Sequence, residues 1–269
     1  HRSIWANCSP LLLVLQMGQV ASTSIADALD AVGAWNVVHI HHLDHRRIER
    51  LSKQNMERGV AQPPNLLRSQ AVLEWLAQDP GQVQIVSAVR DPVARNLSAF
   101  FENAHNFLSI EDGEIRNTPE ETAEIFVTAY RQTNALDWFD ANIRRVFKLD
   151  VFSRDFDHEH KRLIAKNARC RLIVVRAEDD DTVKARVIAR HLRLNHLELG
   201  RANIAQAKAY AGHYEKVKAV IRMPEDLLDQ LYDSKLTRHF YTEEEIAGFR
   251  AKWGGRADGS ILAATAGGR

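Results

Sequence analysis

The sequence predicts an α/β fold of three layers, in which a central parallel sheet of about four to five strands lies between helices. Residues 11–15 are continuously apolar, as in a strand buried on both faces, and residues 82–89 and 170–175 are short runs that are mostly apolar. Residues 35–43 form another β-prone run. Helical patterns separate these runs, and that alternation is typical of parallel strands joined by helices. The 269 residues, 45% of them hydrophobic, are enough to fill the core of one large domain.

The segments between the predicted strands justify the helical layers. After the first strand, apolar residues recur at helical spacing and a glycine follows them, at Ile25, Ala26, Leu29, Val32 and Gly33. A charged helix over 45–59 is ended by Pro63-Pro64, and a further helix follows over 65–78. Pro92 stands near the first turn of the next helix, and the chain is predicted to stay mostly helical to about residue 165, with loops around 111–119 and 149–160.

The C-terminal region is predicted to be helical throughout. Residues 182–253 have helical spacing, with breaks near Asn203 and at Met223-Pro224, and Thr242 with Glu245 forms a capping box. The last residues, 254–269, are rich in Gly and Ala and lack either period, which predicts a flexible tail. We therefore expect a single domain over residues 1–253.

Composition excludes several classes of protein. The 36 Lys and Arg nearly cancel the 35 Asp and Glu, which argues against a nucleic-acid partner. The longest apolar run near the start, residues 11–15, is far shorter than the roughly 20 residues of a membrane span. Two cysteines, Cys8 and Cys170, are too few for a disulfide scaffold and favour a reducing compartment, so the cytoplasm is the expected location. Because His1 is not an initiator Met, flanking domains are expected in a longer gene product.

A first candidate anion site follows the first strand, in the stretch VLQMGQVASTSIADAL at residues 14–29. A strand, a turn and a helix start place free backbone N–H groups where the helix dipole favours an anion. Gly18 lets backbone approach a ligand, and Ser22, Thr23 and Ser24 add hydroxyls. A full P-loop requires G-x-x-x-x-G-K-[ST], but here Ala21 and Ser22 replace the second Gly and the Lys. The same residues also fit simple helix capping.

A second candidate site follows the third predicted strand. Arg90 ends the strand, and Arg95 and Ser98 lie three residues apart on one face of the next helix. Arg90 and Ser98 can converge on one phosphate, since arginine supplies a charged fork and serine a hydroxyl. The alternative is a surface turn in which Asp91 caps the helix.

Together the two elements resemble the sulfotransferases that use 3′-phosphoadenosine 5′-phosphosulfate. Residues 90–98, RDPVARNLS, match that superfamily's pattern R-[DE]-P-x-x-R-x-x-S in full. The chain is more similar still to bacterial capsular polysaccharide synthesis proteins of the sulfotransferase type. QMGQVASTSI is similar to that family's loop Q-x-G-K-V-G-S-[ST]-[ST]-I, and VVHIHHL to its strand V-x-H-x-H-x-L. DWFDANIRRVFKLDVF and HFYTEEEIAGFRAKW are also similar, so the resemblance covers roughly residues 11–253.

The resemblance implies a P-loop-like sulfotransferase fold, 3′-phosphoadenosine 5′-phosphosulfate as donor, adenosine 3′,5′-bisphosphate as product and no metal. The implied 3′-phosphate site is Arg90 with Ser98, joined by Arg95, and a late basic loop would add Arg201 and Asn203. The implied 5′-phosphosulfate site is the first loop, with Gln16, Gly18, Gln19, Val20, Ala21, Ser22, Thr23 and Ser24.

One residue departs from the family pattern. Gln19 stands where sulfotransferases commonly carry a basic residue, which neutralises the bridging oxygen as the sulfuryl group leaves. Glutamine donates a hydrogen bond but carries no charge, so we expect weaker stabilisation of the leaving group. Arg46, Arg47 and Lys53 are the candidates to replace that charge.

Sulfuryl transfer to a hydroxyl also needs a proton acceptor, and histidine suits neutral pH. The run HIHHLDH offers His39, His41, His42 and His45 at the carboxyl end of the second predicted strand, the edge where α/β sheets hold ligands. Strand alternation places His39 and His41 on one face, so His41 is predicted to be the base with His39 in support. A metal site with Asp44 and an ordinary polar strand end are the alternatives; the run lacks a recognisable zinc spacing.

The predicted function is transfer of a sulfuryl group to a hydroxyl, with a carbohydrate as the expected acceptor. Trp138 and Phe139, in DWFD, either stack on a sugar or belong to the core, and aromatic residues of this kind favour the core. Two other functions fit the same residues. One is a nucleotide kinase-like phosphotransferase, against which the missing lysine counts, and the other is a non-catalytic nucleotide- or glycan-binding module of a larger protein.

Overall fold

The structure is a computed structural model that describes residues 10–20, 22–200 and 210–255. Of the predicted features, Ala21, Arg201, Asn203 and nearly all of the tail lie outside the described residues, as does the side chain of Ser22. Within the described part, no helix is both long enough and apolar enough to cross a membrane.

A five-stranded sheet forms the centre of the fold, in the order β2-β1-β3-β7-β6. Its strands are β1 (Leu11–Leu15), β2 (Asn36–Ile40), β3 (Val83–Val89), β6 (Leu163–Lys166) and β7 (Cys170–Arg176). The first four in this order run parallel, and β6 pairs antiparallel with β7 at one edge. The predicted α/β class is thus confirmed. The prediction of helix up to about residue 165 is wrong for β6, which alternates buried and exposed residues as an edge strand does.

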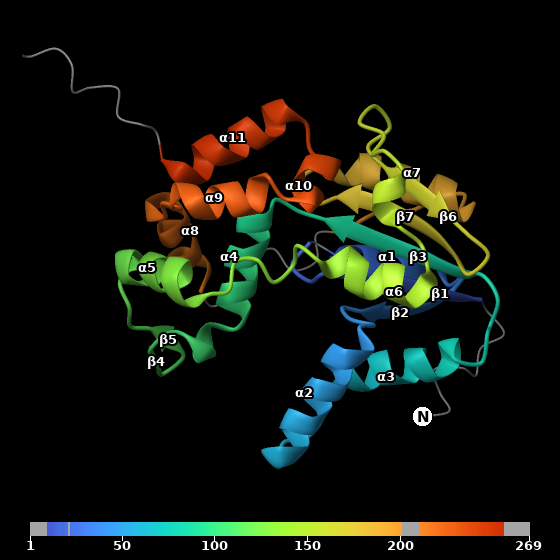
Figure 1. The fold of residues 1–269 in the computed structure, drawn as a ribbon, viewed down its shortest axis with the longest axis horizontal. Coiled ribbons are helices and arrows are strands. Elements are labelled where there is room, and N and C mark those ends of the chain that lie inside the picture. Colours follow the sequence, from blue (N-terminus) through green and yellow to red (C-terminus); the bar gives the residue numbers. More distant parts are fainter. Residues whose placement is uncertain (1–9, 21, 201–209, 256–269) are drawn as a thin grey trace, which may run out of the picture.

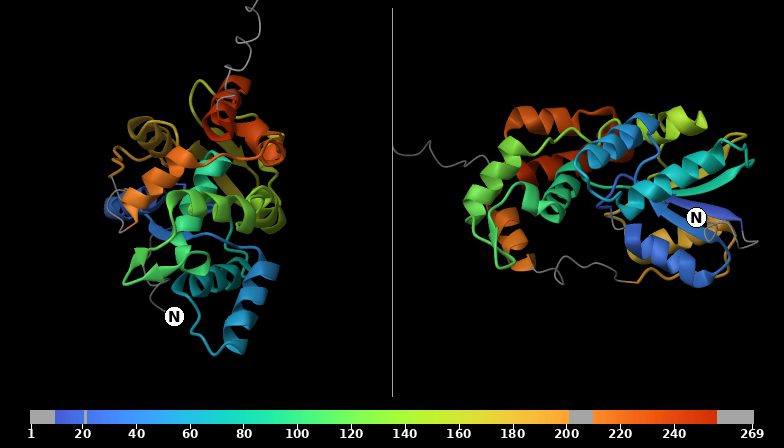
Figure 2. Two further views of the ribbon diagram at one scale, coloured as in Figure 1. Left: turned by 90° about the vertical axis from the view of Figure 1, so that its left-hand side faces the viewer. Right: turned by 90° about the horizontal axis from the view of Figure 1, so that it is seen from below.

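Helices cover both faces of the sheet. Figures 1 and 2 show α1 (Ser22–Val32) and α7 (Asp181–Leu192) on one face, and α3 (Pro64–Leu76) and α6 (Arg145–Phe147) on the other. The chain moves from β1 to β2 in one direction and from β2 to β3 in the other, so right-handed crossovers place α1 and α3 on opposite faces. Three layers result, as predicted.

The remaining helices lie beside the sheet. α2 (His45–Glu57) extends away from it next to α3, and α4 (Pro92–Glu102) and α5 (Pro119–Ala129) gather with the C-terminal helices at one end (Figure 1). Those helices are α8 (Ala211–Val220), α9 (Glu225–Tyr232), α10 (Lys235–Phe240) and α11 (Glu243–Gly254). Short elements complete the described chain: the hairpin β4 (Ile110–Glu111) and β5 (Glu114–Ile115), the 3-10 turns Ala104–Asn106 and Val151–Ser153, and a π-helical segment, Asp140–Arg144.

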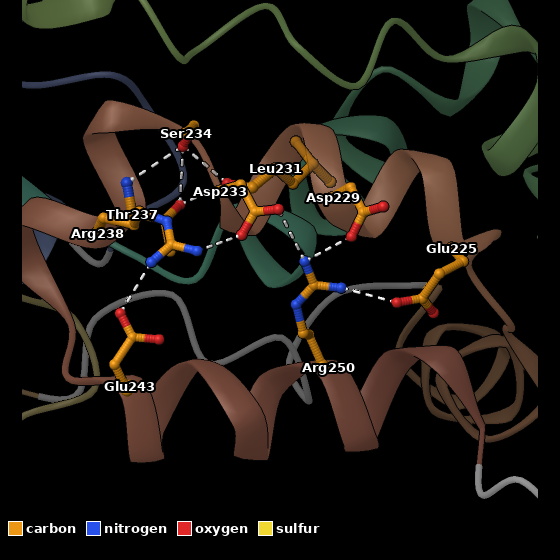
Figure 3. A network of polar contacts seen from close by, with 9 residues as sticks. All are labelled: Glu225, Asp229, Leu231, Asp233, Ser234, Thr237, Arg238, Glu243 and Arg250. Carbon is orange, nitrogen blue, oxygen red and sulfur yellow. Dashed lines mark hydrogen bonds and ion pairs between the residues drawn. The ribbon is translucent and has the colours of Figure 1, made fainter.

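Two arginines tie the C-terminal helices together at the surface (Figure 3). Arg250 on α11 donates to Asp229 at 2.7 Å and to Glu225 at 2.8 Å, both on α9. Arg238 on α10 donates to Asp233 and to Glu243, which links both neighbouring helices. The predicted helical region is confirmed in outline, with the expected break at Met223-Pro224, but residues 193–200 are not helical.

Candidate anion-binding site

The loop after β1 turns sharply before α1. Gly18 has a φ of 78° and Gln19 a φ of 61°, so two successive residues adopt the left-handed conformation. Glycine does so without strain, whereas the side chain of Gln19 costs roughly 1–2 kcal/mol there. A Cβ added at Gly18 would meet nothing within 4 Å, so the backbone on that side faces open space. This turn is what brings the N-terminus of α1 to the carboxyl edge of the sheet.

Arg95 holds the shape of this loop from α4. Its Nη2 donates to the carbonyl oxygen of Met17 at 2.8 Å, and its Nε to that of Gly18 at 3.4 Å. Its Nη1 donates to the Asn96 side chain at 3.0 Å. These contacts direct the Arg95 guanidinium toward the backbone of the loop. Arg95, which the motif predicts together with Arg90 and Ser98, therefore supports the loop.

Arg90 and Ser98 do come together, as their spacing predicts. Arg90 Nη1 donates to Ser98 Oγ at 3.0 Å and to the carbonyl oxygen of Gln19 at 2.9 Å. Ser98 Oγ also lies 3.3 Å from the hydroxyl of Tyr214, a buried residue on α8 that belongs to no motif in the sequence. The loop after β1 and the motif after β3 therefore form one site, and a C-terminal helix completes it.

Asp91 anchors this turn to the C-terminal helices. Its buried carboxylate accepts hydrogen bonds from Val93 N at 3.1 Å, Tyr232 Oη at 2.7 Å and Trp253 Nε1 at 2.7 Å. Burial raises the pKa of Asp91, and the hydrogen bonds from Tyr232 and Trp253 oppose that rise. Asp91 caps the helix as predicted, but it is also fully buried. Its bonds to Tyr232 and Trp253 fix the neighbouring Arg90 relative to α9 and α11.

The two predicted histidines meet at one side chain, Gln16. The Nε2 atom of Gln16 lies 2.9 Å from His39 Nε2 and 2.9 Å from His41 Nδ1, and its Oε1 accepts from Gly18 N at 2.5 Å. Since β2 ends at Ile40, the predicted strand over 35–43 is too long, and His41 lies in the turn that follows. Gln16 thus connects the loop to the histidine pair.

The surroundings of the histidines keep the rings neutral. Burial, His41 and Arg68 lower the pKa of His39 to about 4, and burial together with Arg47, His41 and Arg95 lowers that of His42 to about 3. Burial also lowers the pKa of His41, although a hydrogen bond to the Gln16 backbone opposes this. A base must be neutral before it accepts a proton, so all three rings are in that form at pH 7.

Two residues before and within the π-helical segment hold the turn after β2. Trp138 Nε1 donates to the carbonyl oxygen of His41 at 2.9 Å. Asn142 Oδ1 accepts from Leu43 N at 2.7 Å and from Asp44 N at 3.0 Å. Trp138 is 4% exposed and Phe139 1%, which confirms the core interpretation of both aromatics. The fold nevertheless places Trp138 directly behind the histidine turn.

The structure separates the three candidates for the charge absent at Gln19. Arg46 is exposed, and Lys53 is exposed and 3.8 Å from Glu57, on the outer surface of α2. Arg47 is half-buried, its Nε is buried without a hydrogen-bond partner among the described residues, and its charge lowers the pKa of His42 and of Arg95. Arg47 is therefore the one of the three that lies within electrostatic reach of the site.

The remaining predicted residues contribute differently. Val20 is 1% exposed, so its side chain belongs to the core, and Ser24 is 8% exposed at the start of α1, next to the half-buried Thr23. Among the residues that the structure describes, His45 contacts Glu49, and no three His, Cys, Asp or Glu side chains are grouped to hold a metal ion.

The fold is a three-layer α/β architecture, and the candidate anion loop after β1 lies at the carboxyl edge of its sheet. Residues 114–242 are similar to the family described as Putative capsular polysaccharide synthesis protein. The matched segment begins at β5 and ends at Thr242, so it includes Trp138, Asn142 and Tyr214 but neither the Gly18 loop nor Arg90 and Ser98. No curated protein and no solved structure gives a significant match.

Proposed function

We propose that the chain is a sulfotransferase, which moves a sulfuryl group from 3′-phosphoadenosine 5′-phosphosulfate to a hydroxyl of a carbohydrate. The contact of Arg90 with both Ser98 and Gln19 carries the proposal. This contact joins two candidate anion-binding elements that are 71 residues apart in the sequence. One is the loop at the N-terminus of α1, and the other is the guanidinium of Arg90 with the hydroxyl of Ser98. A donor with phosphate at both ends of its nucleoside requires two such elements.

Each part of the site has a role in the proposed reaction. The backbone N–H groups at the Gly18 turn and the first turn of α1 would bind the 5′-phosphosulfate, and Arg90 with Ser98 the 3′-phosphate. Arg95 would act indirectly, because it holds the carbonyl groups of Met17 and Gly18. The acceptor oxygen forms a bond to sulfur, the bond from sulfur to the phosphate oxygen breaks, and that oxygen keeps the electron pair.

His41 is the proposed proton acceptor for the attacking hydroxyl. Its lowered pKa keeps it neutral before the reaction, and the Gln16 backbone favours the charged ring once the proton has arrived. Trp138 fixes the backbone at His41, so the ring has a defined place at the edge of the sheet.

The carbohydrate acceptor is proposed from the comparison over residues 114–242, whose family description refers to polysaccharide synthesis. The location proposed with this function is the cytoplasm, because the two cysteines favour a reducing compartment.

Transfer of labelled sulfate from the donor to a mixture of glycans tests the proposal. The expected result is transfer that is lost in Arg90→Ala and reduced on the order of 10²-fold in His41→Ala. Donor binding without transfer to any glycan would favour a non-catalytic binding module, which the uncharged Gln19 also permits. Unchanged turnover in His41→Ala would remove that residue as the base.

A further inference from the structure

The side chain of Gln16 occupies a position that an anion in the loop requires. Gln16 is the residue after β1, it is fully buried, and its Oε1 accepts from the backbone N–H of Gly18. That N–H is one of the donors that the turn offers, and an amide oxygen on it stands where a phosphate or sulfate oxygen would bind.

The other end of the same amide covers the histidine pair. Because Oε1 is the acceptor for Gly18, the Nε2 atom must be the NH₂ end, which has two protons to donate. It lies 2.9 Å from His39 Nε2 and from His41 Nδ1, so each ring accepts at that nitrogen. The proton of His39 is then on Nδ1 and that of His41 on Nε2, and the one lone pair of His41 that could take a proton is covered by Gln16.

We propose that Gln16 is a positioning residue that couples the loop to His41, an inference that rests on the proposed function. An anion that takes the Gly18 N–H displaces Oε1, the amide turns away, and His41 Nδ1 is released. The histidine therefore becomes a competent base only when the donor is in place, so donor binding precedes proton transfer.

The charges around His41 agree with this order of events. Arg68 from α3 and Arg95 from α4 face it with positive charge, His39 and His42 are its neutral neighbours, and Arg47 from α2 acts on His42. None of the described groups that shift the pKa of His41 is a carboxylate. A bound dianion would therefore supply the negative charge that this cluster lacks and would favour the protonated ring.

Nitrogen NMR of the histidine rings tests the coupling directly, because it reports which ring nitrogen carries the proton. In the ligand-free protein we expect the Nδ1–H form of His39 and the Nε2–H form of His41. Adenosine 3′,5′-bisphosphate, and inorganic sulfate as a second probe, should change the His41 signals and raise its proton affinity at least tenfold.

Two variants and a control separate coupling from packing. In Gln16→Ala the fixed ring forms should be lost without ligand, and adenosine 3′,5′-bisphosphate should bind severalfold more tightly because nothing competes for the Gly18 N–H. Gln16→Glu keeps the acceptor for Gly18 but cannot donate to the rings, so the proton affinity of His39 and His41 should rise at least tenfold even if the alanine variant folds poorly. Gln78→Ala, at an exposed glutamine after α3, should behave as the unmodified protein.

The outcomes distinguish this inference from the proposed function. A response of His41 to sulfate but not to adenosine 3′,5′-bisphosphate would keep the coupling and overturn the nucleotide site. The opposite ring forms in the ligand-free protein, no response to either probe, or weaker nucleotide binding in Gln16→Ala would overturn the coupling.

Discussion

Replacement of Asp91 by alanine should destabilise the protein far more than loss of an ordinary helix cap. The substitution leaves the Tyr232 hydroxyl and the Trp253 indole N–H buried without an acceptor, at a cost of about 1–3 kcal/mol each. Loss of the cap to Val93 N adds about 1 kcal/mol. Burial of the charged Asp91 carboxylate is itself unfavourable and raises its pKa, so removal of the carboxylate offsets part of these costs. The expected net loss of unfolding free energy is about 3–5 kcal/mol.

A second capping aspartate provides the matched control. Asp180 caps α7 by accepting from Thr182 N, but it is exposed and has no buried aromatic donors, so Asp180→Ala should cost much less than Asp91→Ala. Urea unfolding followed by circular dichroism gives both free energies of unfolding. Equal losses in the two variants would refute the conclusion that Asp91 anchors the C-terminal helices to the Arg90 turn.

Three further predictions concern the site and the core. Arg95→Ala should lower the free energy of unfolding, measured in urea, by about 2–4 kcal/mol and should also weaken nucleotide binding. Arg90→Ala should weaken nucleotide binding with little loss of stability. The reverse pattern would contradict the roles assigned to the two arginines. Burial lowers the pKa of His191 from 6.5 to about 4, so its contribution to stability is present above pH 6.5 and is lost as the pH falls towards 4. In His191→Leu, the loss of unfolding free energy between pH 7 and pH 4.5 should be smaller by up to about 3 kcal/mol. An equal loss in the variant and in the unmodified protein would exclude His191 as the source of this acid dependence. Gln19→Lys should raise sulfate transfer on the order of 10²-fold, because it restores a cation beside the leaving group, and unchanged transfer would show that the charge already comes from elsewhere.

Local pattern was sufficient to predict most of the fold. β1 is a continuous apolar run, β3 and β7 are mostly apolar, and Pro92 marks the start of α4, so neighbouring residues alone indicate these elements. β6 has four residues and gains its hydrogen bonds from β7, and β2 stops at Ile40 although the β-prone residues continue. Both features depend on pairing between strands, which the periodicity of one segment does not contain.

The site was predictable to the extent that its spacing is local. Arg90 and Ser98 lie eight residues apart on a strand end and the following helix, so their approach follows from regular geometry. The loop carbonyls that Arg95 binds are 77 and 78 residues away, and Tyr214 is 116 residues from Ser98. The role of Gln16 likewise requires the register of β1 against β2, which places the histidines beside it. Such contacts are set by the assembled sheet.

Calorimetric titration with adenosine 3′,5′-bisphosphate tests the central claim most directly, because this compound carries both phosphates that the two elements are proposed to bind. The predicted result is a dissociation constant of about micromolar order, weakened at least about tenfold in Arg90→Ala through loss of a charged hydrogen bond. Absence of binding, or equal affinity in the unmodified protein and in Arg90→Ala, would contradict the proposed donor site.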